Sequence, residues 1–298
     1  MTRVTQRSVS ATMLGGLQAN LQRMQDLQQQ LSSGKRLTRP SDDPVDTSAA
    51  MQLRSELRRT EQHVRNADDG LAWLGTTDSV LTRSSELAGR ARTLVLAGLN
   101  DTNGPESRAA LAAEVRALRS ALLDAANTRY LDRPVLAGTA LTGEAYAADG
   151  SYRGDGGTVS RTVAPGTPVP VGTTGPEVYG ADGADDQLFA VLERLAASLE
   201  TGGPTMHDDL DRDLGRLDSA LDRLTTALGL VGARTNRVEA VRAAASDGAL
   251  ALKGSLATTE DIDLAKTIVD LQMQEVAYNA ALGATARVVQ PSLVDFLR

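Results

Sequence analysis

Three aspartates spaced two residues apart are the first group in this sequence that could do chemistry. Asp209, Asp211 and Asp213 match the first ligand positions of a calcium-binding loop. The rest of that loop is missing, because the sixth position is Leu214 instead of glycine and the twelfth is Ala220 instead of glutamate. Leucines recur around the aspartates at helical spacing, so a solvated acidic face of a helix is the better interpretation.

Two glycine-containing stretches invite comparison with phosphate-binding loops. Gly34-Lys35 fails that comparison, since Gln29 stands where the first glycine is needed and Arg36 where a serine or threonine would bind magnesium. A glycine that ends a helix explains this pair better. No strand-to-helix crossover follows residues 154–157, so their glycines are more typical of a hairpin.

The two histidines, His63 and His207, have no matched serine, cysteine or aspartate pattern, and both are predicted to be surface residues. The chain has no cysteine and only 3% aromatic residues, which argues against a large aromatic-lined pocket. We therefore predict no enzymatic activity, no cofactor and no metal site. A hydrolase with its site in the middle of the chain is a remote alternative.

The charge and hydropathy of the 298 residues exclude further classes of partner. A formal net charge of −7 argues against nucleic-acid binding, which needs a concentrated basic surface. No apolar run approaches the roughly 20 residues that cross a bilayer, so we expect no membrane contact. The first residues lack the apolar segment of a cleaved signal peptide, which leaves the cytoplasm or export without cleavage.

Apolar residues at steps of three and four predict a helix near each end of the chain. The stripe of the first helix comprises Val9, Met13, Leu17, Leu21, Met24, Leu27 and Leu31. The stripe of the last helix comprises Leu264, Ile268, Leu271, Tyr278, Leu282 and Val289. Residues 1–65 carry ten Lys/Arg and six Asp/Glu, whereas residues 257–298 carry three Lys/Arg and six Asp/Glu. The two ends of the chain would therefore attract each other. The alternative is that these charges lie on two solvated helix faces and have no such role.

Longer helices are predicted between these ends. Asp43 and Pro44 form an N-terminal helix signal, and the apolar period that follows continues to Val95 as a coiled-coil seam. Further helical periods cover 111–125, 188–199 and 210–256, with a polar joint at 255–261. Between 129 and 185 the sequence is rich in Gly, Pro, Thr and Val, which predicts short strands such as 158–163 and 169–171.

These elements predict a mainly α fold with a β-rich insertion, in which both chain ends contribute to a long antiparallel helical bundle or coiled coil. We expect residues 1–44 with 257–298 to form an inner assembly domain of terminal helices. Residues 45–128 with 186–256 would form a long helical bundle, and residues 129–185 a small outer insertion. Two terminal helices bury only one side of each, so they need neighbouring molecules to cover the rest.

Several motifs resemble those of the flagellin family. At the N-terminus these are Gln28–Leu37 and Pro40–Pro44, ahead of a long helix, and at the C-terminus Glu260–Ala265 with Gln274, Tyr278, Ala280 and Leu282. Three further stretches resemble family members of the hook-filament junction more than flagellin itself. They are Asn127–Leu131 with Leu136–Thr139, Gly229–Arg237, and Ser292–Leu297. One departure is Asp132–Pro134, which stands where the family usually has a more continuous apolar run.

The resemblance implies a structural subunit of the extracellular bacterial flagellum, exported by the flagellar type III apparatus without cleavage after protection by a chaperone. It implies a ring of copies between a hook-associated protein on the hook side and flagellin on the filament side. A small flagellin and an intracellular coiled-coil adaptor are the alternatives. The residues that we expect at assembly contacts are Leu17, Leu21, Met24, Leu27, Leu264, Ile268, Leu271, Leu282, Leu293 and Phe296.

Overall fold

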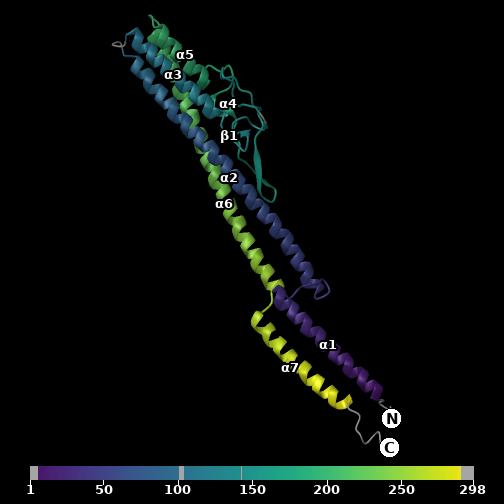
Figure 1. Cartoon of the computed structure of the whole chain (residues 1–298). Coiled ribbons are helices and arrows are strands. Elements are labelled where there is room, and N and C mark those ends of the chain that lie inside the picture. The colour runs from purple at the N-terminus through teal and green to yellow at the C-terminus, as the bar shows by residue number, and fades with distance from the viewer. Residues whose placement is uncertain (1–5, 101–103, 142, 290–298) are drawn as a thin grey trace, which may run out of the picture. The chain divides into compact units, whose positions relative to one another are not determined.

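The computed structural model is mainly helical (Figure 1). It describes residues 6–100, 104–141 and 143–289, with the side chains of 11–100, 104–141 and 143–286. The helices are α1 (Gln6–Ser33), α2 (Pro44–Gly98), α3 (Pro105–Ala126), α4 (Gly175–Tyr179), α5 (Leu188–Thr201), α6 (Met206–Glu260) and α7 (Leu264–Val289). The strands are β1 (Arg129–Tyr130), β2 (Arg133–Pro134), β3 (Ser160–Ala164) and β4 (Thr167–Pro170). The predicted helical fold with an inserted strand region is confirmed.

Local chemistry explains where the first helices end and begin. Gly34 follows α1 with a φ of +70°, and its N–H donates to the carbonyl of Gln30 at 2.8 Å. The carboxylate of Asp43 accepts from the N–H groups of Val45 and Asp46 at 3.1 and 3.0 Å. Both predicted helix signals, a glycine after the C-terminus and an aspartate at the N-cap, are therefore confirmed.

The polar joint predicted at residues 255–261 is wrong over most of its length, because α6 continues to Glu260. The hydroxyls of Thr258 and Thr259 donate to the carbonyls of Gly254 and Ser255, four residues earlier, at 3.0 and 2.9 Å. Polar side chains that are satisfied in this way can stay within a helix. Only residues 261–263 separate α6 from α7.

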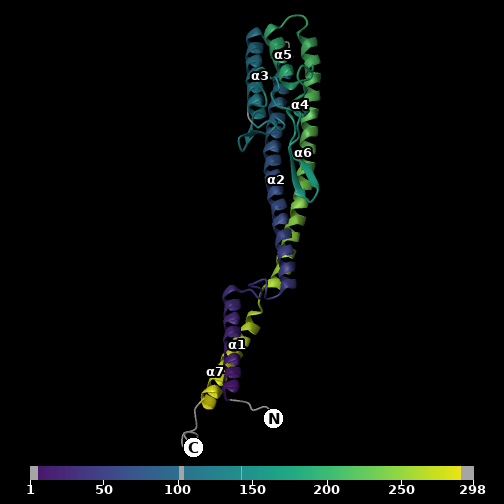
Figure 2. The same cartoon turned by 90° about the vertical axis from the view of Figure 1, so that its right-hand side faces the viewer.

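The chain forms two compact units, and their boundaries lie within α2 and α6. The terminal unit comprises residues 1–58 and 249–298. In it, α1 and α7 lie side by side and run in opposite directions, as both views show (Figures 1 and 2). The expected division of the chain into three parts stays a prediction.

The central unit, residues 59–248, contains one continuous apolar core. In this unit α2 and α6 lie side by side, and α3 packs against α5 (Figure 2). The largest fully buried side chains are Trp73, Leu74, Leu81, Leu122, Leu136, Tyr146, Tyr179, Leu188, Phe189, Leu192, Leu195 and Leu199. An ion pair of 2.6 Å between Arg92 and Asp218 also joins α2 to α6.

The insertion between α3 and α5 holds two small antiparallel sheets, β1–β2 and β3–β4, and the short helix α4. Most of its length is irregular, so its strand content is lower than its composition suggests. The side chain of Asn127 bonds to the backbone carbonyl and N–H of Tyr146 at 2.9 and 2.8 Å. Arg234 on α6 donates to the carbonyl of Gly172 at 2.8 Å. These contacts fix the insertion to the helices.

Candidate assembly surface

The contact between α1 and α7 is narrow and partly polar. Residues of α7 that are buried or half-buried recur at steps of three and four, with Asp270 beside them, and are Thr267, Leu271, Gln274, Tyr278, Ala281 and Thr285. The amide of Gln274 donates to the carbonyl of Asn20 on α1 at 3.1 Å. Among the described residues of the terminal unit, the only buried apolar side chains are those of Ala50 and Ala249. The helix pair therefore has no apolar core of its own.

Large apolar side chains are instead exposed on the terminal unit. Eleven of the fifteen exposed large apolar residues described in the chain belong to it, namely Leu14, Leu21, Val45, Met51, Leu250, Leu264, Ile268, Val269, Met273, Val276 and Leu282. We call the six on α7, from Leu264 to Leu282, the outer face of α7. Exposed apolar surface concentrated in this way is typical of an association site.

The predicted contact residues fall into three groups. Leu17, Met24 and Leu27 on α1, and Leu271 on α7, are half-buried along the helix pair. Leu21, Leu264, Ile268 and Leu282 are exposed and open to a partner molecule. Leu293 and Phe296 lie outside the described residues. That these residues make assembly contacts stays a prediction.

Three exposed residues of α7 were missed in the sequence. Val269, Met273 and Val276 are spaced four and three residues apart, which is the signal of a second apolar stripe on the same helix. When only one apolar stripe is sought along a helix, residues outside that stripe are assigned to the polar side of the helix. In α7 the polar residues Thr267 and Gln274 face α1 instead, so the more apolar side of the helix is the outer one.

One buried carboxylate joins the segments where the helices of the terminal unit meet. The side chain of Glu260 is only 2% exposed and receives hydrogen bonds of 2.7 Å each from Lys35 and Arg54. Burial alone would raise the pKa of Glu260, but the hydrogen bonds from these two cations outweigh it and lower that pKa. The backbone N–H of Arg36 donates to the Glu260 carbonyl and that of Ile262 to the Gly34 carbonyl.

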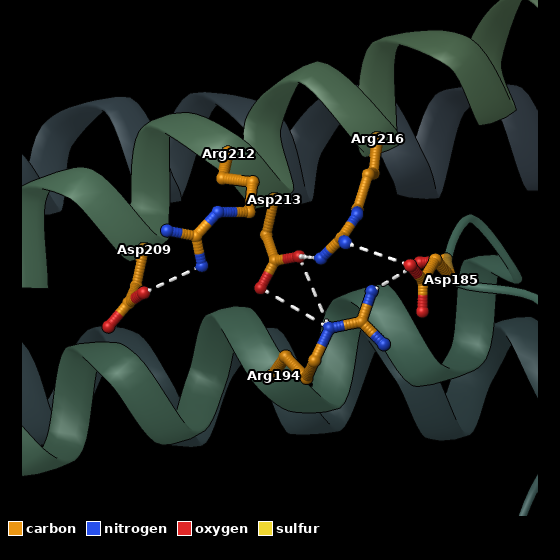
Figure 3. Close-up of polar contacts among 6 residues, drawn as sticks. All are labelled: Asp185, Arg194, Asp209, Arg212, Asp213 and Arg216. Atoms are coloured by element: carbon orange, nitrogen blue, oxygen red, sulfur yellow. Dashed lines mark hydrogen bonds and ion pairs between the residues drawn. The ribbon is translucent and has the colours of Figure 1, made fainter.

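Two members of the acidic triplet that mimics a calcium loop, Asp209 and Asp213, pair with arginines (Figure 3). Asp213 is almost fully buried and accepts from Arg194 on α5 at 3.2 Å and from Arg216 on its own helix at 2.8 Å. Asp209 pairs with Arg212 at 2.9 Å, so the aspartates do not converge. In the part of the chain that the structure describes, no cluster of metal-ligating side chains occurs.

The remaining candidate groups also have structural explanations. Nδ1 of His63 lies 3.3 Å from the carbonyl oxygen of Thr162 in β3, and His207 lies in the first turn of α6. Gly34 and Lys35 belong to the joint around Glu260.

Across the described ranges, no helix is both long and apolar enough to cross a bilayer.

The first part of the chain is similar to proteins of the flagellin family. Residues 4–140 match the family model described as the bacterial flagellin N-terminal helical region. The flagellar hook-associated protein 3 of Escherichia coli (strain K12) is 26% identical over 276 residues, which cover 86% of this chain and 87% of that protein. The resemblance to flagellin-family proteins predicted from the sequence is confirmed.

Two further proteins mark the range of these similarities. A flagellin of Halalkalibacterium halodurans is 22% identical over 271 residues, covering 91% of this chain and 90% of that protein. The solved structure of the flagellar junction protein FlgL from Legionella pneumophila has a TM-score of 0.58 and 16% identity, covering 73% of this chain and all of that one. This second likeness shows that the fold is shared.

The joint around Glu260 generates a stability prediction. Glu260→Gln removes the charge from both ion pairs, and because Lys35 and Arg54 are partly exposed and can be rehydrated, the loss is about 1–2 kcal/mol in the free energy of unfolding. Circular dichroism during urea unfolding measures it. Since the pKa of Glu260 is lowered on folding, the wild-type advantage is present at neutral pH and disappears as the pH falls below 4.5. A difference that persists at acidic pH would contradict this assignment.

The acidic triplet generates a second prediction. Asp213→Ala removes the buried carboxylate between Arg194 and Arg216 and is expected to destabilise the chain by about 1–2 kcal/mol. Asp211→Ala, at an exposed neighbouring position, is the control and should change the unfolding free energy by less than about 0.5 kcal/mol. Calcium and chelator should leave the melting temperature of the wild-type chain unchanged. A calcium-dependent increase would restore the metal-site reading.

Proposed function

We propose that this chain is a structural subunit of the bacterial flagellum that forms the junction between hook and filament. The observation that carries the proposal is the outer face of α7, with Leu14 and Leu21 of α1, which is apolar and uncovered in a single chain. Packing against neighbouring molecules would bury this surface, and the hydrophobic effect would drive assembly. The similarity to hook-associated protein 3 over most of both chains supports this particular role.

The three predicted parts of the chain have distinct roles in this proposal. The terminal helices, residues 1–44 with 257–298, lie innermost and pack against other copies in a ring. Residues 45–128 and 186–256 form the long helical bundle, and the insertion of residues 129–185 is the outer part of the proposed assembly. A buried apolar core gives the central unit stability without neighbours, whereas the terminal unit reaches its full burial only in the assembly.

Several partners follow from this role. Copies of the chain form the ring, a hook-associated protein lies on the hook side and flagellin on the filament side. An export chaperone covers the C-terminal helix before secretion, because the exposed apolar residues of α7 would otherwise associate too early. Export proceeds through the flagellar type III apparatus without cleavage of a signal peptide, and the final location is extracellular.

A substitution on the outer face of α7 tests the assembly role. Val276→Asp places a charge on a residue that is 70% exposed, so the isolated chain should unfold at the wild-type temperature. In the assembly the charge would be buried, and we expect about tenfold or greater loss of filaments attached to hooks. Motility in soft agar and electron microscopy of cells measure this.

Matched variants make that test specific. Leu230→Asp, an exposed leucine of α6 in the central unit, should leave filament attachment unchanged. Leu271→Asp, on the half-buried side of α7, and removal of residues 290–298 with Leu293 and Phe296 should both reduce attachment. Normal filaments in all three α7 and C-terminal variants would reject the proposed role.

Copy number separates a junction protein from a small flagellin. A junction subunit forms a short ring, so it should be a minor component of sheared filaments and present in purified hook preparations. A filament-forming flagellin would dominate the sheared material. Quantitative mass spectrometry of both fractions from wild-type cells distinguishes the two, and dominance in the filament fraction would overturn the junction assignment.

A further inference from the structure

The connector after α1 and the connector before α7 run past each other as a short antiparallel ladder. Lys35 and Asp261 form the central pair of this ladder. On one side of the pair the N–H of Arg36 donates to the carbonyl of Glu260 at 2.6 Å, and a second backbone hydrogen bond of 3.1 Å closes the other side. The Glu260 carboxylate accepts from Lys35 and from Arg54 on α2 at 2.7 Å each, so one side chain joins α6, α2 and the connector.

Burial in the terminal unit is concentrated around this joint. Beside the buried carboxylate, Thr267 in the first turn of α7 is only 7% exposed. The Thr267 hydroxyl donates to the carbonyl of Asp263 at 2.8 Å, and the carboxylate of Asp263 caps α7 by accepting from the N–H of Lys266 at 3.1 Å. Among the described side chains of residues 11–33 and 268–286, none is buried. Each helix of the pair is therefore held most firmly at the end that meets the joint.

A helix that packs against no core needs a fixed starting point. Its first turn is costly to form, and in proteins most of the stability of a helix comes from packing. Gly34 closes the C-terminus of α1, and Asp263 caps the N-terminus of α7. Since both of these fixed ends lie at the joint, helical order should extend from the joint toward Gln6 in α1 and toward Val289 in α7.

We propose that Glu260 is a clasp that couples the order of α1 to that of α7. With its carboxylate bound to Lys35 and Arg54, the clasp holds the end of one helix beside the start of the other, and the pair forms as one unit. When the carboxylate is lost, both helices loosen together, although Glu260 belongs to neither of them. The competing explanation is a local one, in which Glu260 only closes the last turn of α6.

The clasp also has a consequence for the assembly surface. A helix that is already ordered loses less conformational entropy when it binds than a helix that must fold on binding. By holding α7 beside α1, the clasp presents the outer face of α7 in a preorganised form. The coupling itself is a property of the single chain, whereas this role in assembly rests on the proposed function.

Hydrogen exchange measured by mass spectrometry on the isolated full chain tests the coupling. Glu260→Gln should raise the exchange rates of amides in both α1 and α7 by about tenfold, and those of residues 59–248 should not change. In the wild-type chain, protection should be highest beside the joint and fall toward the other end of each helix. Faster exchange confined to the last turn of α6, or no protection of α1 and α7 in the wild-type chain, would overturn the inference.

An exposed carboxylate of α7 provides the matched control. Glu275→Gln removes the same charge from α7 itself, away from the joint, and should leave exchange in both helices unchanged. An equal effect of the two variants would mean that net charge controls the order of the pair, and the clasp would be rejected.

A disulfide across the ladder replaces the clasp by a covalent bond. Lys35 and Asp261 are a non-hydrogen-bonded antiparallel pair, a geometry that places Cα atoms about 4.5 Å apart, within the range of about 4.4–6.8 Å that a disulfide spans. In the Glu260→Gln chain, which has no cysteine of its own, Lys35→Cys with Asp261→Cys should restore the protection of both helices, and reductant should abolish it. If the bond forms and neither helix regains protection, the joint does not couple them.

Failure of this inference can be told apart from failure of the proposed function, because exchange is measured without the flagellum. Filament attachment in cells should fall by about tenfold in Glu260→Gln and recover with the disulfide. Unchanged exchange in Glu260→Gln rejects the clasp and leaves the junction role in place. Absence of the wild-type chain from isolated flagella rejects the junction role, and exchange in the isolated chain then decides the coupling alone.

Discussion

A pair of helices can cover only one side of each partner, and this constraint governs the terminal unit of the chain. In α1 and α7 even the covered side is partly polar, with Thr267 and Gln274 in the contact. The apolar residues Val269, Met273 and Val276 face outward. Full burial of a side chain of this size contributes about 1.5–3 kcal/mol, so covering the outer face of α7 in an assembly would add several kcal/mol per chain. That gain is comparable to the whole stability of many domains, about 5–15 kcal/mol.

The central unit shows the opposite balance. Its core brings Trp73, Tyr146, Tyr179 and Phe189 together with leucines from four helices, and the largest of these side chains are fully buried. Tyr146, Tyr179 and Phe189 pack with ring centroids 4.9–5.6 Å apart, although the chain as a whole is poor in aromatic residues. Concentration of aromatic residues in the central unit gives that unit a buried apolar core, which the described part of the terminal unit lacks.

The sequence predicted those features that depend on local chemistry or on a regular apolar period. Gly34 and Asp43 mark helix boundaries correctly because capping involves only neighbouring residues. The apolar period did not predict that polar residues of α7 face α1, because a helix face assigned from apolar residues assumes that the polar residues face water. The burial of Glu260 was equally hidden, because its two cations lie more than 200 positions earlier in the chain. The turn at Leu131 breaks the usual preference for glycine, so no local pattern predicts it.

Polar contacts set the register of the terminal helices and leave their apolar residues free to face outward. The N–H of Ile262 donates to the carbonyl of Gly34, and further along the pair Gln274 donates to the carbonyl of Asn20. At about 1.5 Å per helical residue, the path from Gly34 to Asn20 is about 21 Å and that from Ile262 to Gln274 about 18 Å. The two contacts thus agree with one antiparallel alignment. Because polar contacts help to fix that alignment, the exposed apolar residues of α7 remain available to another molecule.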